Sequence, residues 1–168
     1  MTALDPVPDS LALAVEAINT GDSVVLAGPR AHTRPLVAAL SDTLDPALVI
    51  GSLDGGQLTG DCDVLVPPEL TDVDPTPVLT AADAGRAILA SCPPSASAEQ
   101  TLLELTDCCA RHGLDAGLAR HLVATHVDLV VGIDDVGGVQ WVDHVTTTAD
   151  AEPLVQRLHP APGLSREV

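Results

Sequence analysis

The chain has 168 residues, 46% of them hydrophobic, which is enough to fold as one domain with a core. Its 24 acidic residues face only 7 basic ones, all arginine, and the net charge of −17 argues against the basic face that nucleic-acid binding needs. No apolar run is long enough to span a membrane, and the first ten residues do not read as a signal peptide, so we expect a cytoplasmic protein without membrane insertion.

The expected elements alternate between helix and strand along most of the chain. Continuous apolar runs bounded by glycine, proline or aspartate predict buried strands, and apolar periodicity predicts helices, of which the one at 97–113 is expected to be capped by Ser97. The expected helices cover 10–20, 34–44, 80–86, 97–113 and 115–126, and 80–86 is either a short helix or the end of a longer one. The expected strands cover 23–28, 47–53, 63–67, 87–91, 127–133 and 139–145, with loops at 55–62 and 69–77.

This order predicts a three-layer α/β domain over 1–150, with a mainly parallel sheet and a C-terminal β-hairpin on the turn at 134–138. The tail, 151–168, is expected to hold a short helix at 151–159 and to be partly disordered.

The acidic surface is typical of halophiles, in which salt screens charge repulsion; a surface that binds a basic partner is the alternative. The four cysteines lack C-x-x-C spacing, so we expect free, buried thiols and no metal site. They are Cys62, Cys92, Cys108 and Cys109.

The segment 24–40, VVLAGPRAHTRPLVAAL, has the strand–loop–helix layout of a phosphate-binding loop. Gly28 occupies the place of the first glycine, but Thr33 replaces the second glycine, Arg34 the lysine and Pro35 the magnesium-binding hydroxyl. The candidate nucleotide-binding residues are Gly28, Arg30, His32, Thr33 and Arg34. From this pattern an ordinary turn, a decayed phosphate loop and a working one all stay open.

The second acidic segment is DVLVPPELTD at 63–72, in which carboxylates follow an apolar strand. Such carboxylates hold magnesium and polarise water in P-loop enzymes, but in a chain this rich in aspartate, acids after a strand are common and a solvated acidic loop also explains them. Glu69 is therefore a candidate catalytic residue, and Asp54, which follows the strand at 47–53, is another.

Taken in order, these segments resemble the RecA-like P-loop ATPase domain of the type II/type IV secretion, pilus-assembly and archaellum motor ATPases, in a haloarchaeon-like form. The resemblance spans about 11–145. In it, DVLVPPELTD at 63–72 is similar to the Walker B segment, and AADAGRAILASCPPSASAEQTL at 81–102 to the stretch that contains the family's histidine box. THVDLVVGIDDVGGVQWVDHV at 125–145 resembles the closing hairpin.

The resemblance implies a P-loop fold with ATP and Mg²⁺ as cofactors, and the departures from it imply little or no ATP hydrolysis. The phosphate-loop lysine and magnesium hydroxyl are absent; Leu53 stands at the catalytic glutamate and Pro93 at the box histidine. We therefore expect a degenerate, truncated relative, a pseudo-ATPase that associates with itself or with a paralogous motor ATPase. A divergent but active ATP hydrolase and an α/β interaction module without a nucleotide site are the alternatives.

Overall fold

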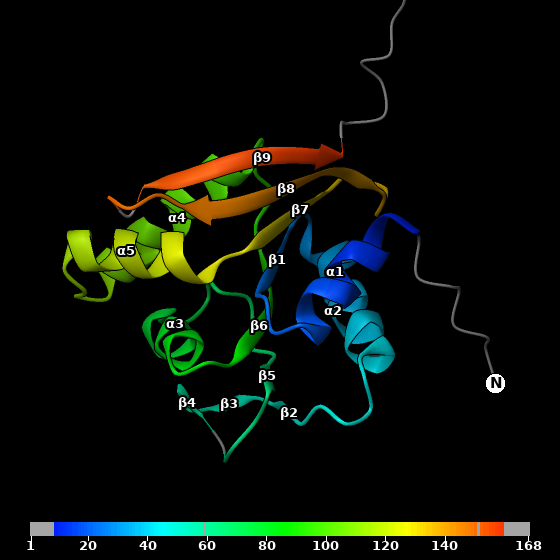
Figure 1. Ribbon diagram of the computed structural model, residues 1–168, viewed down its shortest axis with the longest axis horizontal. Helices are drawn as coiled ribbons and strands as arrows, with labels where there is room; N and C mark the ends of the chain where they lie inside the picture. Colours follow the sequence, from blue (N-terminus) through cyan, green and yellow to red (C-terminus); the bar gives the residue numbers. More distant parts are fainter. Residues whose placement is uncertain (1–8, 59, 151, 160–168) are drawn as a thin grey trace, which may run out of the picture.

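The computed structural model describes residues 9–58, 60–150 and 152–159 (Figure 1). Its helices are α1 (Asp9–Asn19), α2 (Arg30–Thr43), α3 (Thr76–Asp83), α4 (Ala98–Arg111) and α5 (Ala116–His126). Its strands are β1 (Val24–Ala27), β2 (Ile50–Gly51), β3 (Leu53–Asp54), β4 (Gln57–Leu58), β5 (Val64–Leu65), β6 (Ala87–Cys92), β7 (Leu129–Ile133), β8 (Val139–Thr147) and β9 (Pro153–His159).

Within the described residues, seven strands form one sheet in the order β2-β5-β6-β1-β7-β8-β9, and β3 and β4 form a separate hairpin. The strands from β2 to β7 in this order run parallel, whereas β8 and β9 add to the edge in antiparallel fashion. The α/β class, the mainly parallel sheet and the hairpin of β7 and β8 are thus confirmed.

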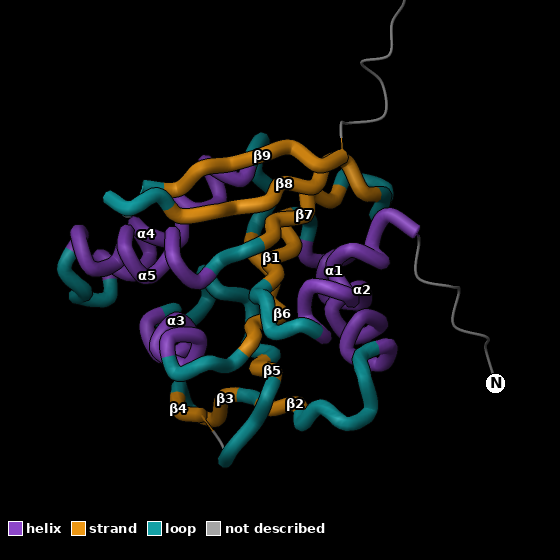
Figure 2. Tube along the Cα trace, viewed as in Figure 1, coloured by secondary structure: helices purple, strands orange, loops and turns teal. Residues whose placement is uncertain are grey.

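Two helical layers cover the sheet, and Figure 2 shows α1 and α2 on one side with α3, α4 and α5 on the other. Alternation along β1 explains the two cores, because successive side chains of a strand point to opposite faces. Val24 and Leu26 pack into the cluster that contains residues of α1 and α2, while Val25 and Ala27 pack into the cluster beneath the other three helices. β1 is fully buried, as its continuous apolar sequence predicts.

The capping prediction for α4 is confirmed, and the structure adds a cap at the start of α5. The Ser97 hydroxyl accepts a hydrogen bond from the backbone N–H of Gln100 at 3.2 Å, which fixes the start of α4. The Asp115 carboxylate accepts from the N–H groups of Gly117 and Leu118 at the start of α5. Among the described helices, none is long and apolar enough to cross a bilayer.

The segment after Asp150 does not form the helix expected at 151–159, because its described residues form a strand, β9. β9 pairs with β8 through six residues, including Val155 opposite Val145 and Arg157 opposite Asp143. The spacing of the apolar residues in this segment is compatible with a helix and with a strand. The hydrogen bonds to the edge of β8 favour the strand. The expected disorder after this point lies outside the described residues.

One further prediction is wrong in detail. The strand expected to be buried at 47–53 contributes only the two residues of β2 to the seven-stranded sheet, at its edge, where Ile50 is 44% exposed. The alternative that 80–86 is the end of a longer helix is confirmed in part: α3 starts behind Pro75 and ends at Asp83, and Gly85 then adopts a φ of 93° that suits glycine.

All four cysteines are buried and free, as predicted. Burial raises the pKa of Cys92 to about 12 and that of Cys109 to about 11. Because all four thiols are buried, and because the thiolate that reacts is disfavoured at Cys92 and Cys109, we expect iodoacetamide at mildly alkaline pH to label none of them in the native protein and all four in denaturant. Mass spectrometry of the alkylated chain reads out the number of labels.

The same shifts predict a loss of stability in alkali. In the unfolded chain the thiols of Cys92 and Cys109 ionise near pH 9, whereas in the folded protein their raised pKa keeps them protonated at higher pH. The unfolded state is therefore favoured progressively as the pH rises from about 9 towards 12. Urea unfolding across this range checks the slope, and replacing Cys92 by alanine, which removes one of the two shifted groups, is expected to flatten it. A slope that is unchanged in this variant would contradict the prediction.

Candidate functional site

The candidate site lies where the parallel strands end, since their carboxyl ends meet at one edge of the sheet, the usual place for ligands in open α/β folds. β1 leads through Gly28 and Pro29 into α2, and β5 leads through a proline pair into Glu69. β7 leads into the turn at 134–138. The predicted phosphate segment and the predicted acidic segment therefore meet here.

Residues 29–33, which were predicted to form the loop between a strand and a helix, are mostly helical. α2 begins at Arg30, four residues before the predicted start, and Pro35 lies inside it. The backbone N–H groups of His32 and Thr33 donate to the Pro29 carbonyl at 2.9 and 3.0 Å, and that of Gly28 donates to Cys92 at 3.1 Å. These three amides are engaged within the protein and do not converge on a common hollow.

Gly28 and Thr33 serve the packing of this segment. A Cβ atom built on Gly28 would lie 2.7 Å from Cβ and 2.9 Å from the backbone oxygen of Ile133, at the end of β7. Thr33 is completely buried, and its hydroxyl has no hydrogen-bond partner among the described residues. Glycine is therefore required by the close approach of β7, and the threonine methyl fills space against it.

The side chains of Arg30 and His32, at the start of α2, are held by neighbouring groups. The Arg30 guanidinium donates through Nε to Glu69 at 2.9 Å and through a terminal nitrogen to Asp72. The hydrogen bond and charge of Glu69 raise the pKa of Arg30. The ring of His32 contacts the backbone oxygen of Asp135 at 2.9 Å. Arg30 thus neutralises the two carboxylates that follow β5.

A small cavity of about 110 Å³ lies beside this ion pair. It is well below the roughly 300 to 1,000 Å³ of typical small-molecule sites. Its walls hold both arginines of the segment and both carboxylates; the lining residues are Arg30, Arg34, Val37, Pro67, Pro68, Glu69, Asp72 and Ser91.

The structure does not place Asp54 in this cavity. Asp54 is exposed in β3, within the small β3–β4 hairpin, and does not line the cavity that contains Glu69. Among the described residues, no group of three or more histidine, cysteine or acidic side chains is arranged to share a metal ion.

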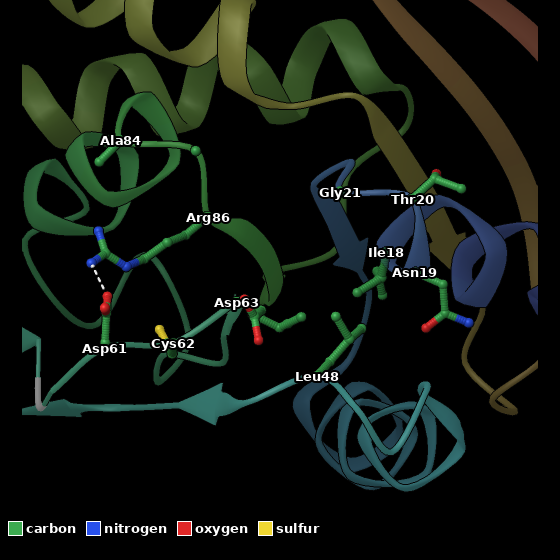
Figure 3. Close-up of a pocket in the computed structure, with 12 residues that line it drawn as sticks. Ile18, Asn19, Thr20, Gly21, Leu48, Asp61, Cys62, Asp63, Ala84 and Arg86 are labelled. Atoms are coloured by element: carbon green, nitrogen blue, oxygen red, sulfur yellow. Dashed lines mark hydrogen bonds and ion pairs between the residues drawn. The ribbon is translucent and has the colours of Figure 1, made fainter.

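A larger cavity, of about 420 Å³, lies at the other end of the parallel strands, where β1, β5 and β6 begin (Figure 3). Gly21, Asp63 and Arg86, which precede β1, β5 and β6, contribute to its walls. Arg86 forms an ion pair with Asp61 at 2.9 Å, and Asp63 accepts from the Val49 N–H at 2.8 Å. The sequence does not indicate this cavity, because its walls come from segments that are far apart in the chain and share no motif.

Comparisons with known proteins relate the fold to one group. No known family profile and no curated protein sequence matches the chain. The VirB11 ATPase of the Brucella suis type IV secretion system, solved with sulphate, matches with a TM-score of 0.61 at 15% identity, over 90% of this chain and 60% of that one. The Legionella pneumophila ATPase DotB matches with a TM-score of 0.56 at 13% identity, over 90% of this chain and 48% of that one.

The chain therefore spans only part of the length of both solved ATPases. Identities this low establish the fold and no more. The arrangement of the sheet and its two helical layers is the RecA-like α/β fold of the secretion ATPases.

Proposed function

We propose that this protein is a non-catalytic, at most weakly nucleotide-binding relative of the type II/type IV secretion and pilus motor ATPases. It works in the cytoplasm by associating with itself or with an active paralogous motor ATPase. The likeness of its fold to VirB11 and DotB supports the relationship. The acidic, lysine-free composition fits a halophilic, archaeal source.

The ion pairs of Arg30 with Glu69 and Asp72 are the observation that carries the non-catalytic part of the proposal. In P-loop enzymes, carboxylates after a strand serve the magnesium ion and the attacking water. In this protein Arg30 lies at the start of the helix that would face the phosphates, and it already pairs with both carboxylates. A metal ion would have to displace this arginine before it reached either of them.

The residues also fit a magnesium–triphosphate complex poorly. The cavity of about 110 Å³ is small for a nucleotide, and the amides of His32 and Thr33 are already bonded to Pro29. Pro35 supplies neither an N–H nor a hydroxyl. We therefore derive no hydrolytic step for this chain.

Isothermal titration with ATP and Mg²⁺ in molar salt, together with a phosphate-release assay, tests the proposal. We expect no saturable binding at sub-millimolar ATP and no turnover above the buffer control. Arg34→Ala is expected to change neither result, because Arg34 is exposed and no phosphate depends on it.

Arg111→Ala is the matched control, since Arg111 is also an exposed arginine but lies at the far end of α4. Robust turnover that Arg34→Ala abolishes and Arg111→Ala leaves intact would overturn the non-catalytic assignment.

That outcome would favour the second candidate, a divergent ATP hydrolase. The observation in its favour is that Arg34 and Glu69 line the same cavity, so an arginine could stand in for the phosphate-loop lysine beside a carboxylate. Asp54, its other candidate carboxylate, lies outside that cavity. The planar guanidinium is also a poor substitute for the point charge of lysine.

A further inference from the structure

A groove between α4 and α5, which we call the α4–α5 groove, lies on the surface away from the candidate nucleotide site. Its volume is about 460 Å³, and it shares no lining residue with the cavity beside Arg30. Figure 1 shows the two helices side by side beneath β8 and β9. Glu152 and Pro153, where β9 begins, complete the wall of the groove. Its volume falls within the roughly 300 to 1,000 Å³ of ordinary binding sites.

One face of α4 forms the first wall of the groove. Its lining residues recur at the spacing of a helical stripe and are Glu99, Leu102, Leu103, Thr106 and Asp107. At about 1.5 Å per residue, this stripe is about 12 Å long, or slightly more than two turns. A carboxylate stands at each end, and the leucines lie between them. Leu103 is 60% exposed, so no described element covers the stripe.

One face of α5 forms the second wall, through Ala116, Arg120, Val123 and Ala124. These residues also follow a helical stripe about two turns long. Val123 and Ala124 are buried, as is Leu102 of the facing helix, so the floor of the groove is apolar. The two alanines leave room for the side chains of an occupant. The groove is therefore suited to apolar side chains along a length of about two helical turns.

The charges around the groove are mostly negative. Glu99, Asp107 and Glu152 line it, together with one described basic residue, Arg120. Arg120 contacts Glu152 at 3.8 Å, and both side chains are more than half exposed. Among the described residues, neither Glu99 nor Asp107 forms an ion pair. The two ends of the α4 stripe thus favour an occupant with a positive charge at each end.

From this pattern we infer that the α4–α5 groove binds a basic amphipathic helix of a partner protein. A helix laid in a groove presents apolar residues at helical spacing, and a stripe of about two turns fills the apolar floor. Arginine or lysine at the two ends of that stripe meets Glu99 and Asp107. The groove thereby specifies the partner of the association in the proposed function, on which this inference rests.

A second copy of this chain offers no such helix. Among the described helices, α1 and α3 have no basic residue, α2 has arginines only towards its start, and α4 has its one arginine in its last turn. α5 has basic residues but lines the groove itself. Two chains of net charge −17 also repel each other. The charge complementarity therefore favours a basic partner over self-association at this surface.

Fluorescence anisotropy of a labelled peptide tests the inference with the full chain. The probe is an alanine-based helical peptide that carries leucine along one face and arginine at both ends of that face. One companion peptide has glutamate in place of arginine, and another has its leucines scattered around the helix. We expect saturable binding of the probe at micromolar concentration, weaker binding in molar salt, and no binding of either companion.

Three changes in the groove have different expected effects. Leu103→Arg places a positive charge in the groove and should weaken binding of the probe by at least about tenfold. Glu99→Gln with Asp107→Asn should weaken it by about fivefold, since it removes two exposed ion pairs. Arg120→Ala should tighten it by about threefold, because it removes a repelling charge and frees Glu152.

Matched controls lie on the other helical layer. Leu13→Arg changes a leucine of α1 that is 45% exposed, and Glu16→Gln with Asp42→Asn removes two exposed carboxylates from α1 and α2. Both controls should bind the probe as the wild type does. Thermal midpoints close to that of the wild type, followed by the fluorescence of the single tryptophan, show that the variants remain folded.

Three outcomes would each overturn the inference. The first is equal binding of the arginine and glutamate peptides, and the second is equal weakening by the groove variants and their controls. The third is a dimer of the chain in sedimentation velocity that Leu103→Arg abolishes, which would assign the groove to a second copy. That third outcome would leave the association in the proposed function standing, and none of the three depends on ATP, so the two proposals fail separately.

Discussion

The Arg157→Ala variant is expected to unfold with a free energy about 3 kcal/mol below that of the wild type, because it leaves a buried carboxylate without its charged partner. Asp143 is 1% exposed and accepts from Arg157 at 2.5 and 3.2 Å, with one further bond at 3.3 Å from the Ala98 N–H. The arginine is 43% exposed, so water compensates in part and the loss falls at the lower end of the usual range for such pairs. Urea unfolding, followed by the fluorescence of the single tryptophan, measures it.

Arg120→Ala is the matched control, since Arg120 pairs with Glu152 at 3.8 Å and both side chains are more than half exposed. It should cost less than about 1 kcal/mol. Adding Asp143→Asn to Arg157→Ala removes the buried charge and should restore part of the lost stability. Equal losses for Arg157→Ala and Arg120→Ala, with no recovery in the double variant, would contradict this account.

Much of the fold could be predicted because the apolar pattern and the capping residues of these segments favour the same structure as their contacts in the folded protein. β1 and β7 are fully apolar runs, and both became buried parallel strands. α4 combined apolar periodicity with a serine cap, an acidic first turn and a basic last turn, and it formed almost as predicted. Where the local signals were equivocal, tertiary contacts decided, as in β9, whose spacing suits helix and strand alike.

The start of α2 shows how tertiary contacts override a local signal. Two prolines, at 29 and 35, are each suited to open a helix, and the sequence does not rank them. The first turn is secured by contacts made outside the helix, from Arg30 to Glu69 and from His32 to Asp135. Helix propensity carries no information about these partners, which lie 39 and 103 residues away along the chain.

Individual residues of the candidate site could be predicted from the sequence, but the pairing between them could not. Arg30 and Glu69 were identified separately as an anion-binding and a catalytic candidate, and the structure joins them in an ion pair. Their pairing depends on how the segment after β5 folds across the start of α2. Asp54 followed the same logic of an acid after a strand, but the shortness of β2 and the β3–β4 hairpin carry it elsewhere.

Replacing Gly28 by alanine distinguishes a packing glycine from a phosphate-binding one. The new Cβ would meet Cβ and the backbone oxygen of Ile133 at 2.7 and 2.9 Å, and neither atom belongs to a flexible side-chain end. We expect a loss of about 1 to 3 kcal/mol in unfolding free energy, as for other overpacked cores. Urea unfolding gives this value, and ATP titration of the same variant shows whether any nucleotide affinity changes with it.

Thr33→Val is the companion variant, on the residue that contacts Gly28 in this packing. It replaces a buried hydroxyl that has no described hydrogen-bond partner by a methyl group of the same shape, so stability should stay equal or rise by about 1 kcal/mol. A phosphate-binding role for this segment predicts the reverse pattern. Gly28→Ala would then leave stability unchanged, and both substitutions would weaken ATP binding, which would reopen the case for a nucleotide site.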